Sequence, residues 1–237
     1  MLNFRSFEAL TFDCYGTLID WENGILRTLR RFRDEHGVDA DDERLLVCYS
    51  RAEAHAQNRP YRKYREVLRD TMRTAAALLG VEGRFDENAL VESLPAWEPF
   101  ADTVAALAAL RRRYRLGIIS NVDDDLFAHT AEHLATPFDW VVTAEQVGSY
   151  KPSQRNFRHA LRVMDLPMQR VLHVAQSKFH DIAPARAMGW ATVWVDRRHG
   201  RPGSGATQHF DATADVTVPD MASLVRRVEH QLQTWDR

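Results

Sequence analysis

The 237-residue chain contains only two cysteines, Cys14 and Cys48. They are too few for a disulfide framework and lack metal-ligand spacing, so we expect a reduced compartment and no structural zinc. Long apolar runs are also missing, because the longest nearly apolar stretch, residues 75–81, is far short of the roughly 18 residues of a membrane-spanning helix. The N-terminus lacks the basic region and apolar run of a signal peptide. These absences predict a cytoplasmic protein.

The chain also has no large excess of positive or negative charge. Lysine and arginine number 31, aspartate and glutamate number 33, and the net charge is −2. This balance offers no general attraction to nucleic acid or to an anionic membrane, so we expect a small-molecule partner. A hydrophobic content of 45% excludes disorder and supplies a core. At about 150 residues per domain, the length predicts one large domain or a domain with an insertion.

Short apolar segments alternate with longer amphipathic segments over much of the chain. This alternation predicts an α/β fold built on a parallel sheet. The expected strands are Ala9–Asp13, Leu116–Ser120, Trp140–Thr143, Val171–Ala175, Thr192–Val195 and Val216–Val218. The expected crossover helices are Thr103–Arg113, Asp125–Leu134, Asn156–Met164 and Ile182–Met188.

About a hundred residues separate the first two expected strands, although a strand-to-strand crossover needs only about thirty. The excess predicts an insertion whose segments Gly24–His36, Glu43–Asn58 and Tyr61–Leu79 have helical patterns. We therefore predict a helical cap over residues 20–97, inserted into a catalytic core made of residues 1–19 and 98–237.

Polar residues follow the expected strands at the edge of the sheet where ligands bind in open parallel folds. In chain order they are Asp13, Ser120, Asn121, Lys151, Ser177 and Asp181. Each residue alone also fits a turn or a helix cap. Their order and placement together predict one crevice that holds two carboxylates, a lysine and a hydroxyl–amide pair beneath the cap.

Four motifs carry a family resemblance that spans essentially the whole chain. They are Phe12–Leu18, Ile118–Asn121, Tyr150–Pro152 and His180–Asp181. On these motifs the chain is identified as a member of the haloacid dehalogenase superfamily of hydrolases. The resemblance implies a Rossmann-like core with an inserted helical cap that covers the site.

Position 15 separates two branches of that superfamily. Most members are magnesium-dependent phosphatases, in which a second aspartate at this position protonates the leaving alkoxide. This chain has Tyr15 there, and a phenol with a pKa near 10 is a poor acid at neutral pH. The Asp-x-Tyr-Gly-Thr form resembles the L-2-haloacid dehalogenases (type II), whose leaving halide needs no proton. We therefore expect no metal and no cofactor.

The resemblance implies a two-step hydrolysis of a short 2-haloalkanoic acid. Asp13 would displace the halide from C2 and form an aspartyl ester, and water would hydrolyse this ester to release a 2-hydroxy acid. Lys151 would keep Asp13 ionised, and Thr17 would orient it. Asp181 would position or deprotonate the water.

The remaining roles concern the substrate. Ser120 and Asn121 would hold the substrate carboxylate, and Arg51, on a cap helix, would receive the departing anion. Tyr15 and Ser177 are predicted to line the same pocket. The partner is then a small 2-substituted carboxylic acid, and the resemblance allows a homodimer.

Some residues depart from the dehalogenase pattern. Phe157 stands where those enzymes have a tyrosine, and one extra residue precedes Asp181 in the fourth motif. The segments Tyr15–Glu22, Val147–Pro152 and Arg197–Gly200 resemble a branch that contains an azetidine-2-carboxylate hydrolase, which opens a strained ring instead of releasing a halide. The leaving group therefore stays open among a halide, a ring amine and, with magnesium, an alkoxide of a phosphate ester.

Overall fold

A parallel sheet forms the centre of the protein, as a computed structural model of residues 2–201 and 205–233 shows. Its six strands lie in the order β3-β2-β1-β4-β5-β6, and every pair is parallel. The strands are β1 (Ala9–Phe12), β2 (Arg115–Ser120), β3 (Trp140–Thr143), β4 (Val171–Ala175), β5 (Ala191–Val195) and β6 (Val216–Val218). The predicted α/β fold class and strand positions are confirmed, with ends that differ by one residue at most.

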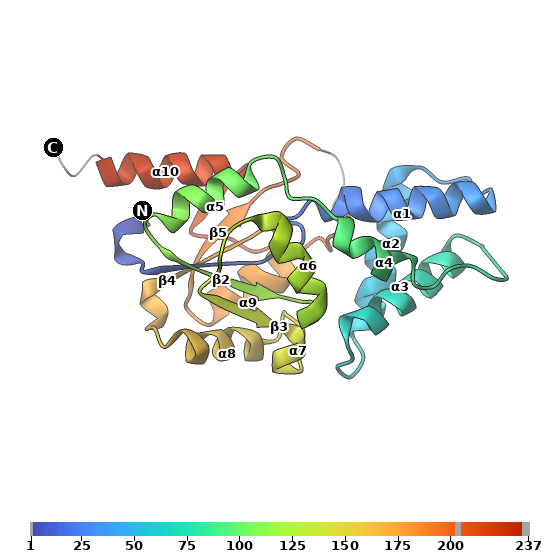
Figure 1. Cartoon of the computed structure of the whole chain (residues 1–237), viewed down its shortest axis with the longest axis horizontal. Helices are drawn as coiled ribbons and strands as arrows, with labels where there is room; N and C mark the ends of the chain where they lie inside the picture. Colours follow the sequence, from blue (N-terminus) through green and yellow to red (C-terminus); the bar gives the residue numbers. More distant parts are fainter. Residues whose placement is uncertain (1, 202–204, 234–237) are drawn as a thin grey trace.

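Helices cover both faces of this sheet (Figure 1). On one face lie α5 (Thr103–Arg111) and α10 (Met221–Gln233), and on the other lie α8 (Gln154–Met164) and α9 (Ala183–Ala187). The central strands β1 and β4 are buried along their whole length, as expected for strands that are covered on both faces of the sheet. The remaining elements of the core are α6 (Asp124–Leu134), α7 (Ala144–Val147), the 3₁₀ turns at Phe4–Ser6 and Met168–Arg170, and a π-helical turn at Lys178–Ile182.

Four helices are inserted between β1 and β2, as the chain spacing predicts. They are α1 (Trp21–His36), α2 (Asp42–Gln57), α3 (Tyr64–Leu78) and α4 (Ala89–Ser93), followed by a 3₁₀ turn at Leu94–Ala96. In Figure 1 they lie together beyond the carboxyl ends of the strands. The chain leaves and re-enters the core side by side, because the Asp20 amide donates to the Glu98 carbonyl at 2.8 Å. The domain boundaries at 19/20 and 97/98 stay a prediction.

Asp123, at the start of α6, ties these inserted helices to the core. Its buried carboxylate accepts hydrogen bonds from the backbone amides of Tyr64 at 2.7 Å and Arg65 at 3.1 Å. The residue before α3, Lys63, makes no capping bond with its own side chain. Asp123 therefore caps α3 from another part of the chain, and this contact fixes Tyr64 beside the sheet edge.

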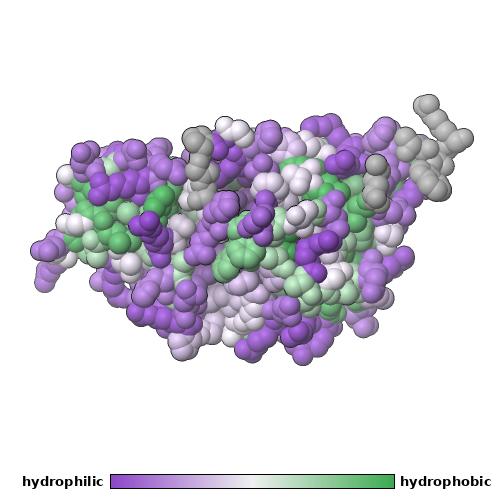
Figure 2. Space-filling view, turned by 180° about the vertical axis from the view of Figure 1, so that it is seen from behind, coloured by the Kyte–Doolittle hydropathy of each residue, from purple (hydrophilic) through white to green (hydrophobic). Residues whose placement is uncertain are grey.

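The outer surface is mostly polar. Figure 2 shows hydrophilic residues over most of the rear face, with separate apolar areas between them. Among the described residues, every helix is too short or too polar to span a bilayer.

Candidate active site

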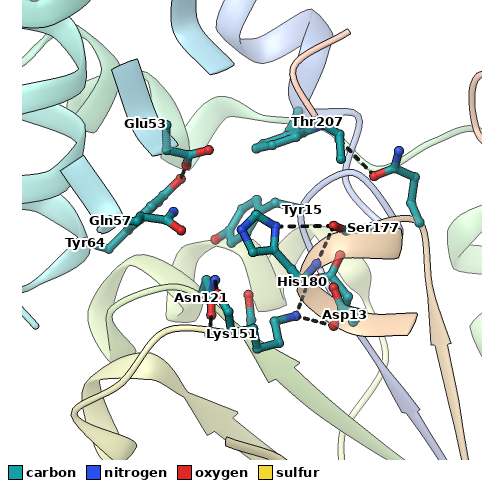
Figure 3. Close-up of a pocket in the computed structure, with 14 residues that line it drawn as sticks. Asp13, Tyr15, Glu53, Gln57, Tyr64, Asn121, Lys151, Ser177, His180 and Thr207 are labelled. Atoms are coloured by element: carbon teal, nitrogen blue, oxygen red, sulfur yellow. Dashed lines mark hydrogen bonds and ion pairs between the residues drawn. The ribbon is translucent and has the colours of Figure 1, made fainter. Parts of the chain in front are cut away.

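A small pocket lies between the carboxyl ends of β1, β2 and β4 and the inserted helices α1 to α3 (Figure 3). The space between its walls, including the open mouth, is about 430 Å³. The residues that line it are Asp13, Tyr15, Trp21, Glu53, Gln57, Tyr64, Ser120, Asn121, Lys151, Gln176, Ser177, His180, Asp181 and Thr207. The sheet register explains the convergence, since Phe12 pairs with both Ile118 and Val174 and so brings three strand ends together.

Lys151 joins the two predicted catalytic carboxylates. Its Nζ lies 2.8 Å from Asp13 Oδ1 and 2.7 Å from Asp181 Oδ1. The third donor of the ammonium goes to the Ile119 carbonyl at 2.8 Å. A lysine ammonium has three hydrogens, so these contacts use its full donor capacity. Lys151 is therefore held in place as a buried counter-charge between Asp13 and Asp181.

Thr17 orients the other oxygen of Asp13. Its hydroxyl donates to Asp13 Oδ2 at 2.7 Å and accepts from the Gln176 amide at 2.9 Å. Because the Gln176 amide can only donate, the Thr17 proton points at the carboxylate. Both Asp13 oxygens are thus bonded, and the carboxylate is fixed at the end of β1.

His173 supports Asp181 from beneath the pocket. The imidazole Nε2 lies 3.0 Å from Asp181 Oδ1, and Nδ1 lies 3.0 Å from the Thr11 hydroxyl. Phe157 packs edge-to-face against this imidazole, with ring centroids 5.3 Å apart. Phe157 is fully buried in the apolar layer under the sheet and does not line the pocket.

Asp181 keeps one oxygen available. Its Oδ2 is buried and has no hydrogen-bond partner. The extra residue before Asp181 is absorbed by the π-helical turn, in which the Ile182 amide bonds to the Ser177 carbonyl at 3.1 Å. The insertion therefore leaves Asp181 within reach of Lys151, with an unpaired acceptor atom.

The two carboxyl groups differ in acidity. Burial raises the pKa of Asp13 and outweighs the opposing effect of Lys151, whereas we expected Lys151 to dominate. For Asp181, burial also disfavours the charged form, but Lys151 and His173 outweigh it and lower the pKa. Burial disfavours the charged form of Lys151 too, but Asp13 and Asp181 outweigh it and raise its pKa. The charged lysine is therefore the stable form in the pocket.

The residues predicted to bind the substrate carboxylate line the pocket, but they differ in whether their side chains already have hydrogen-bond partners. The Ser120 hydroxyl is buried and unpartnered, so it is available to a ligand. The Asn121 side chain instead accepts from the Lys151 amide at 2.7 Å and donates to the Lys151 carbonyl at 3.0 Å. The side-chain carbonyl and one amide hydrogen of Asn121 are therefore bonded to the Lys151 backbone. The Ser177 hydroxyl accepts from the His180 amide at 3.0 Å.

Tyr15 lines the pocket but directs its hydroxyl elsewhere. The phenol oxygen lies 2.8 Å from the Thr130 hydroxyl. Burial raises the pKa of Tyr15 well above its usual value, so the phenol keeps its proton. Tyr15 serves as a wall and is not positioned as an acid.

Arg51 does not come to the pocket. It lies on the exposed side of α2, and among the described residues no arginine lines the site. Glu53 and Gln57, one turn apart on the same helix, line the pocket instead. Glu53 is 6% exposed, and its Oε1 accepts hydrogen bonds from Tyr64 at 2.7 Å and Tyr49 at 3.1 Å.

A signal for Glu53 is present in the sequence. The buried face of α2 contains Leu45, Tyr49, Ala52 and Ala56, and helical spacing places Glu53 on that face. A carboxylate on the buried face of a helix needs polar partners. His180, the first residue of the fourth motif, also lines the pocket, and burial lowers its pKa to about 4.

The comparisons with known proteins agree with this geometry. The model of the haloacid dehalogenase-like hydrolases matches residues 7–189. The chain belongs to this family. An (S)-2-haloacid dehalogenase of Pseudomonas sp. (strain YL) is 25% identical over 229 residues, which cover 94% of each chain.

Solved structures of this family have the same fold. One L-2-haloacid dehalogenase is 26% identical, with a TM-score of 0.75 over 94% of this chain and 99% of that one. The L-2-haloacid dehalogenase of Xanthobacter autotrophicus, solved with chloropropionic acid covalently bound, is 20% identical, with a TM-score of 0.78 over 94% and 98% of the two chains. The hydrolase identity and the enzyme class predicted from the motifs are confirmed. The resemblance to an azetidine-2-carboxylate hydrolase stays a prediction.

Proposed function

We propose that this hydrolase displaces a leaving group from C2 of a short 2-substituted carboxylic acid through an ester of Asp13 and releases a 2-hydroxy acid. The observation that carries the proposal is the fixed arrangement of Asp13 and Asp181 around Lys151 Nζ. The relatives are 2-haloacid dehalogenases, so a 2-haloacid is the reference substrate. A small carboxylic acid fits the size of the pocket.

In the first step, a carboxylate oxygen of Asp13 attacks C2. The new carbon–oxygen bond forms as the bond to the leaving group breaks, and the electron pair departs with that group. Thr17 and Lys151 hold the nucleophile in one orientation, which reduces the entropy that the reaction has to lose. The Ser120 hydroxyl holds the substrate carboxylate in this proposal, and its support is that the hydroxyl lines the pocket and has no partner among the described residues.

In the second step, water attacks the carbonyl carbon of the Asp13 ester. Asp181 Oδ2 is the unpartnered acceptor that orients this water and takes its proton, while Oδ1 stays bonded to Lys151 and His173. The ester bond breaks, the 2-hydroxy acid leaves, and Asp13 returns as a carboxylate. Lys151 neutralises charge that develops at the carbonyl oxygen.

The phosphatase alternative lacks support from the side chains. The Tyr15 hydroxyl is bonded to Thr130 and cannot replace the general acid of phosphatase relatives. A homodimer and a cytoplasmic location stay predictions.

Trapping the ester tests this proposal. Asp181→Asn should accumulate an adduct on Asp13 when mixed with L-2-chloropropionate or L-azetidine-2-carboxylate, and Asp13→Asn should form none. Intact mass and peptide mapping would locate the adduct, with exposed Asp211→Asn as a matched control that behaves as wild type. Product formation by Asp13→Asn, or an adduct on another residue, would contradict the proposal.

A further inference from the structure

Two side chains on the pocket wall formed by α2 have polar atoms without partners. In Figure 3, Glu53 and Gln57 face Lys151 across the open space. The hydroxyls of Tyr64 and Tyr49 donate to Glu53 Oε1 at 2.7 and 3.1 Å. Among the described residues, no hydrogen bond or ion pair reaches Glu53 Oε2 or the side-chain amide of Gln57. Both groups are therefore available to a ligand.

Glu53 offers a hydrogen-bond donor to this space in its protonated form. Burial raises the pKa of the Glu53 carboxyl, and the bonds from Tyr64 and Tyr49 oppose this effect only in part. Because Oε1 accepts both phenol protons, the carboxyl proton belongs on Oε2. Gln57, one turn further along α2, has a carbonyl acceptor and two amide hydrogens. This wall thus provides donors and an acceptor that carry no charge.

A second cavity adjoins the same wall. The residues that line both cavities are Glu53, Gln57, Lys151 and His180. The space between the walls of the second cavity, including its open mouth, is about 630 Å³. Its other polar side chains are uncharged hydroxyls and amides, on Ser50, Asn58, Tyr150 and Gln208. A chain on C2 of the substrate therefore has room beyond the catalytic pocket, among neutral hydrogen-bonding groups.

A charged substituent would find no counter-charge in this region. Within residues 2–201 and 205–233, Lys151 is the one lysine or arginine that lines either cavity, and all three of its hydrogens are already bonded. Burial lowers the pKa of His180 to about 4, so this imidazole is neutral near pH 7. An apolar substituent would instead leave Glu53 and Gln57 without partners, which is unfavourable for buried polar groups. The lining therefore disfavours both kinds of substituent.

We propose that Glu53 and Gln57 form a subsite for a carboxamide at the end of a short chain on C2 of the substrate. This inference rests on the proposed function, because it concerns the substrate of the same attack by Asp13. The carbonyl of a carboxamide accepts from the Glu53 carboxyl, and its nitrogen donates to the Gln57 carbonyl. Side chains four residues apart on a helix have Cβ atoms about 6 Å apart, so one planar group with a donor and an acceptor can contact both.

Three substrates of nearly the same shape test the subsite. L-2-chloro-3-carbamoylpropanoate carries the carboxamide, L-2-chloro-4-methylpentanoate has an isopropyl group in its place, and L-2-chlorosuccinate has a carboxylate. Wild type should use the amide with a kcat/KM about 10-fold or more above that of either other acid. Gln57→Leu should reduce this preference to about 3-fold or less, because leucine removes the hydrogen bonds and keeps most of the volume. The rate with the isopropyl acid should stay equal or rise.

Gln233→Leu is the matched control, since it makes the same change at an exposed position at the end of α10. It should keep the full preference for the amide. Equal or better use of either other acid by wild type would overturn the subsite, as would an amide preference that survives Gln57→Leu. The methyl group of L-2-chloropropionate is too short to reach the subsite, so ester trapping with that acid tests the attack by Asp13 separately.

Binding of unreactive ligands decides the case in which none of the three acids is converted. Succinamate and 4-methylpentanoate lack the leaving group and keep the amide and isopropyl ends. Calorimetry should show wild type binding succinamate about 10-fold or more tightly than 4-methylpentanoate, with the difference lost in Gln57→Leu. Equal affinities, or no binding of succinamate, would overturn the subsite.

Discussion

Replacing Lys151 by methionine should destabilise the protein in a strongly pH-dependent way. The substitution keeps most of the side-chain volume and removes a buried ammonium that contacts Asp13, Asp181 and the Ile119 carbonyl. Breaking one buried ion pair by removing a partner costs about 3–5 kcal/mol. Because two carboxylates lose their counter-charge here, we expect a loss near the upper end at pH 7, which is a large part of a typical total stability of about 5–15 kcal/mol.

The sign of the pH dependence follows from the two carboxyl groups. In wild type, the lowered pKa of Asp181 stabilises the fold above about pH 3.8, and this contribution is lost as the pH falls through the folded pKa. In Lys151→Met, burial and mutual repulsion raise the pKa of both Asp13 and Asp181. The folded variant then binds more protons than the unfolded chain, so its stability is lost as the pH rises. The deficit relative to wild type should therefore be small near pH 4 and large at pH 7.

Urea unfolding at a series of pH values measures this deficit. Lys63→Met is the control, because its ion pair with Glu145 is half exposed and solvent screening leaves it little effect on stability. Adding Asp13→Asn and Asp181→Asn to Lys151→Met should recover most of the loss at pH 7. The reasoning would be refuted if the free energy of unfolding of Lys151→Met were within about 1 kcal/mol of the wild-type value at pH 7. It would also be refuted if the difference between the two proteins did not change with pH.

Two further predictions concern the surroundings of the site. Asp123→Ala should lower the free energy of unfolding by about 1–2 kcal/mol, because it removes the cap of α3, and urea unfolding that matches wild type would show that the cap contributes nothing. His180 has a pKa lowered from 6.5 to about 4, so the unfolded chain binds the extra proton between these values and stability falls as the pH falls. His180→Gln should remove up to about 2 kcal/mol of the loss between pH 6.5 and pH 5, and parallel pH curves for variant and wild type would contradict this.

The sheet and the polar residues at its carboxyl ends were predictable because both depend on local patterns. Short β-branched runs fix the strands, and the loop after each strand places Asp13, Lys151 and Asp181 at one edge whatever the rest of the chain does. The pairing of Lys151 with both carboxylates agrees with the expected site. The net pKa of Asp13 was not predictable, since it depends on how deeply the inserted helices bury the carboxyl.

The residues that the inserted helices contribute to the pocket were harder to predict than the residues at the strand ends. Arg51 and Glu53 are two residues apart on α2, so they lie on nearly opposite faces of the helix. The family resemblance implies a cap arginine and so favours Arg51, whereas the apolar stripe on α2 places Glu53 on the buried face. The contacts of Asp123 with α3 and of His173 with Asp181 join distant parts of the sequence, and no local pattern contains them.

The most direct test of the account is a single turnover in H₂¹⁸O with enzyme in excess over L-azetidine-2-carboxylate or L-2-chloropropionate. Water attacks the carbonyl of the Asp13 ester, so the first product molecule should carry an unlabelled oxygen that came from Asp13. The label should appear in the Asp13 carboxylate, where peptide mass mapping would find it. A labelled product after one turnover would show that water attacked C2 directly with Asp13 as a base, and it would contradict the covalent mechanism.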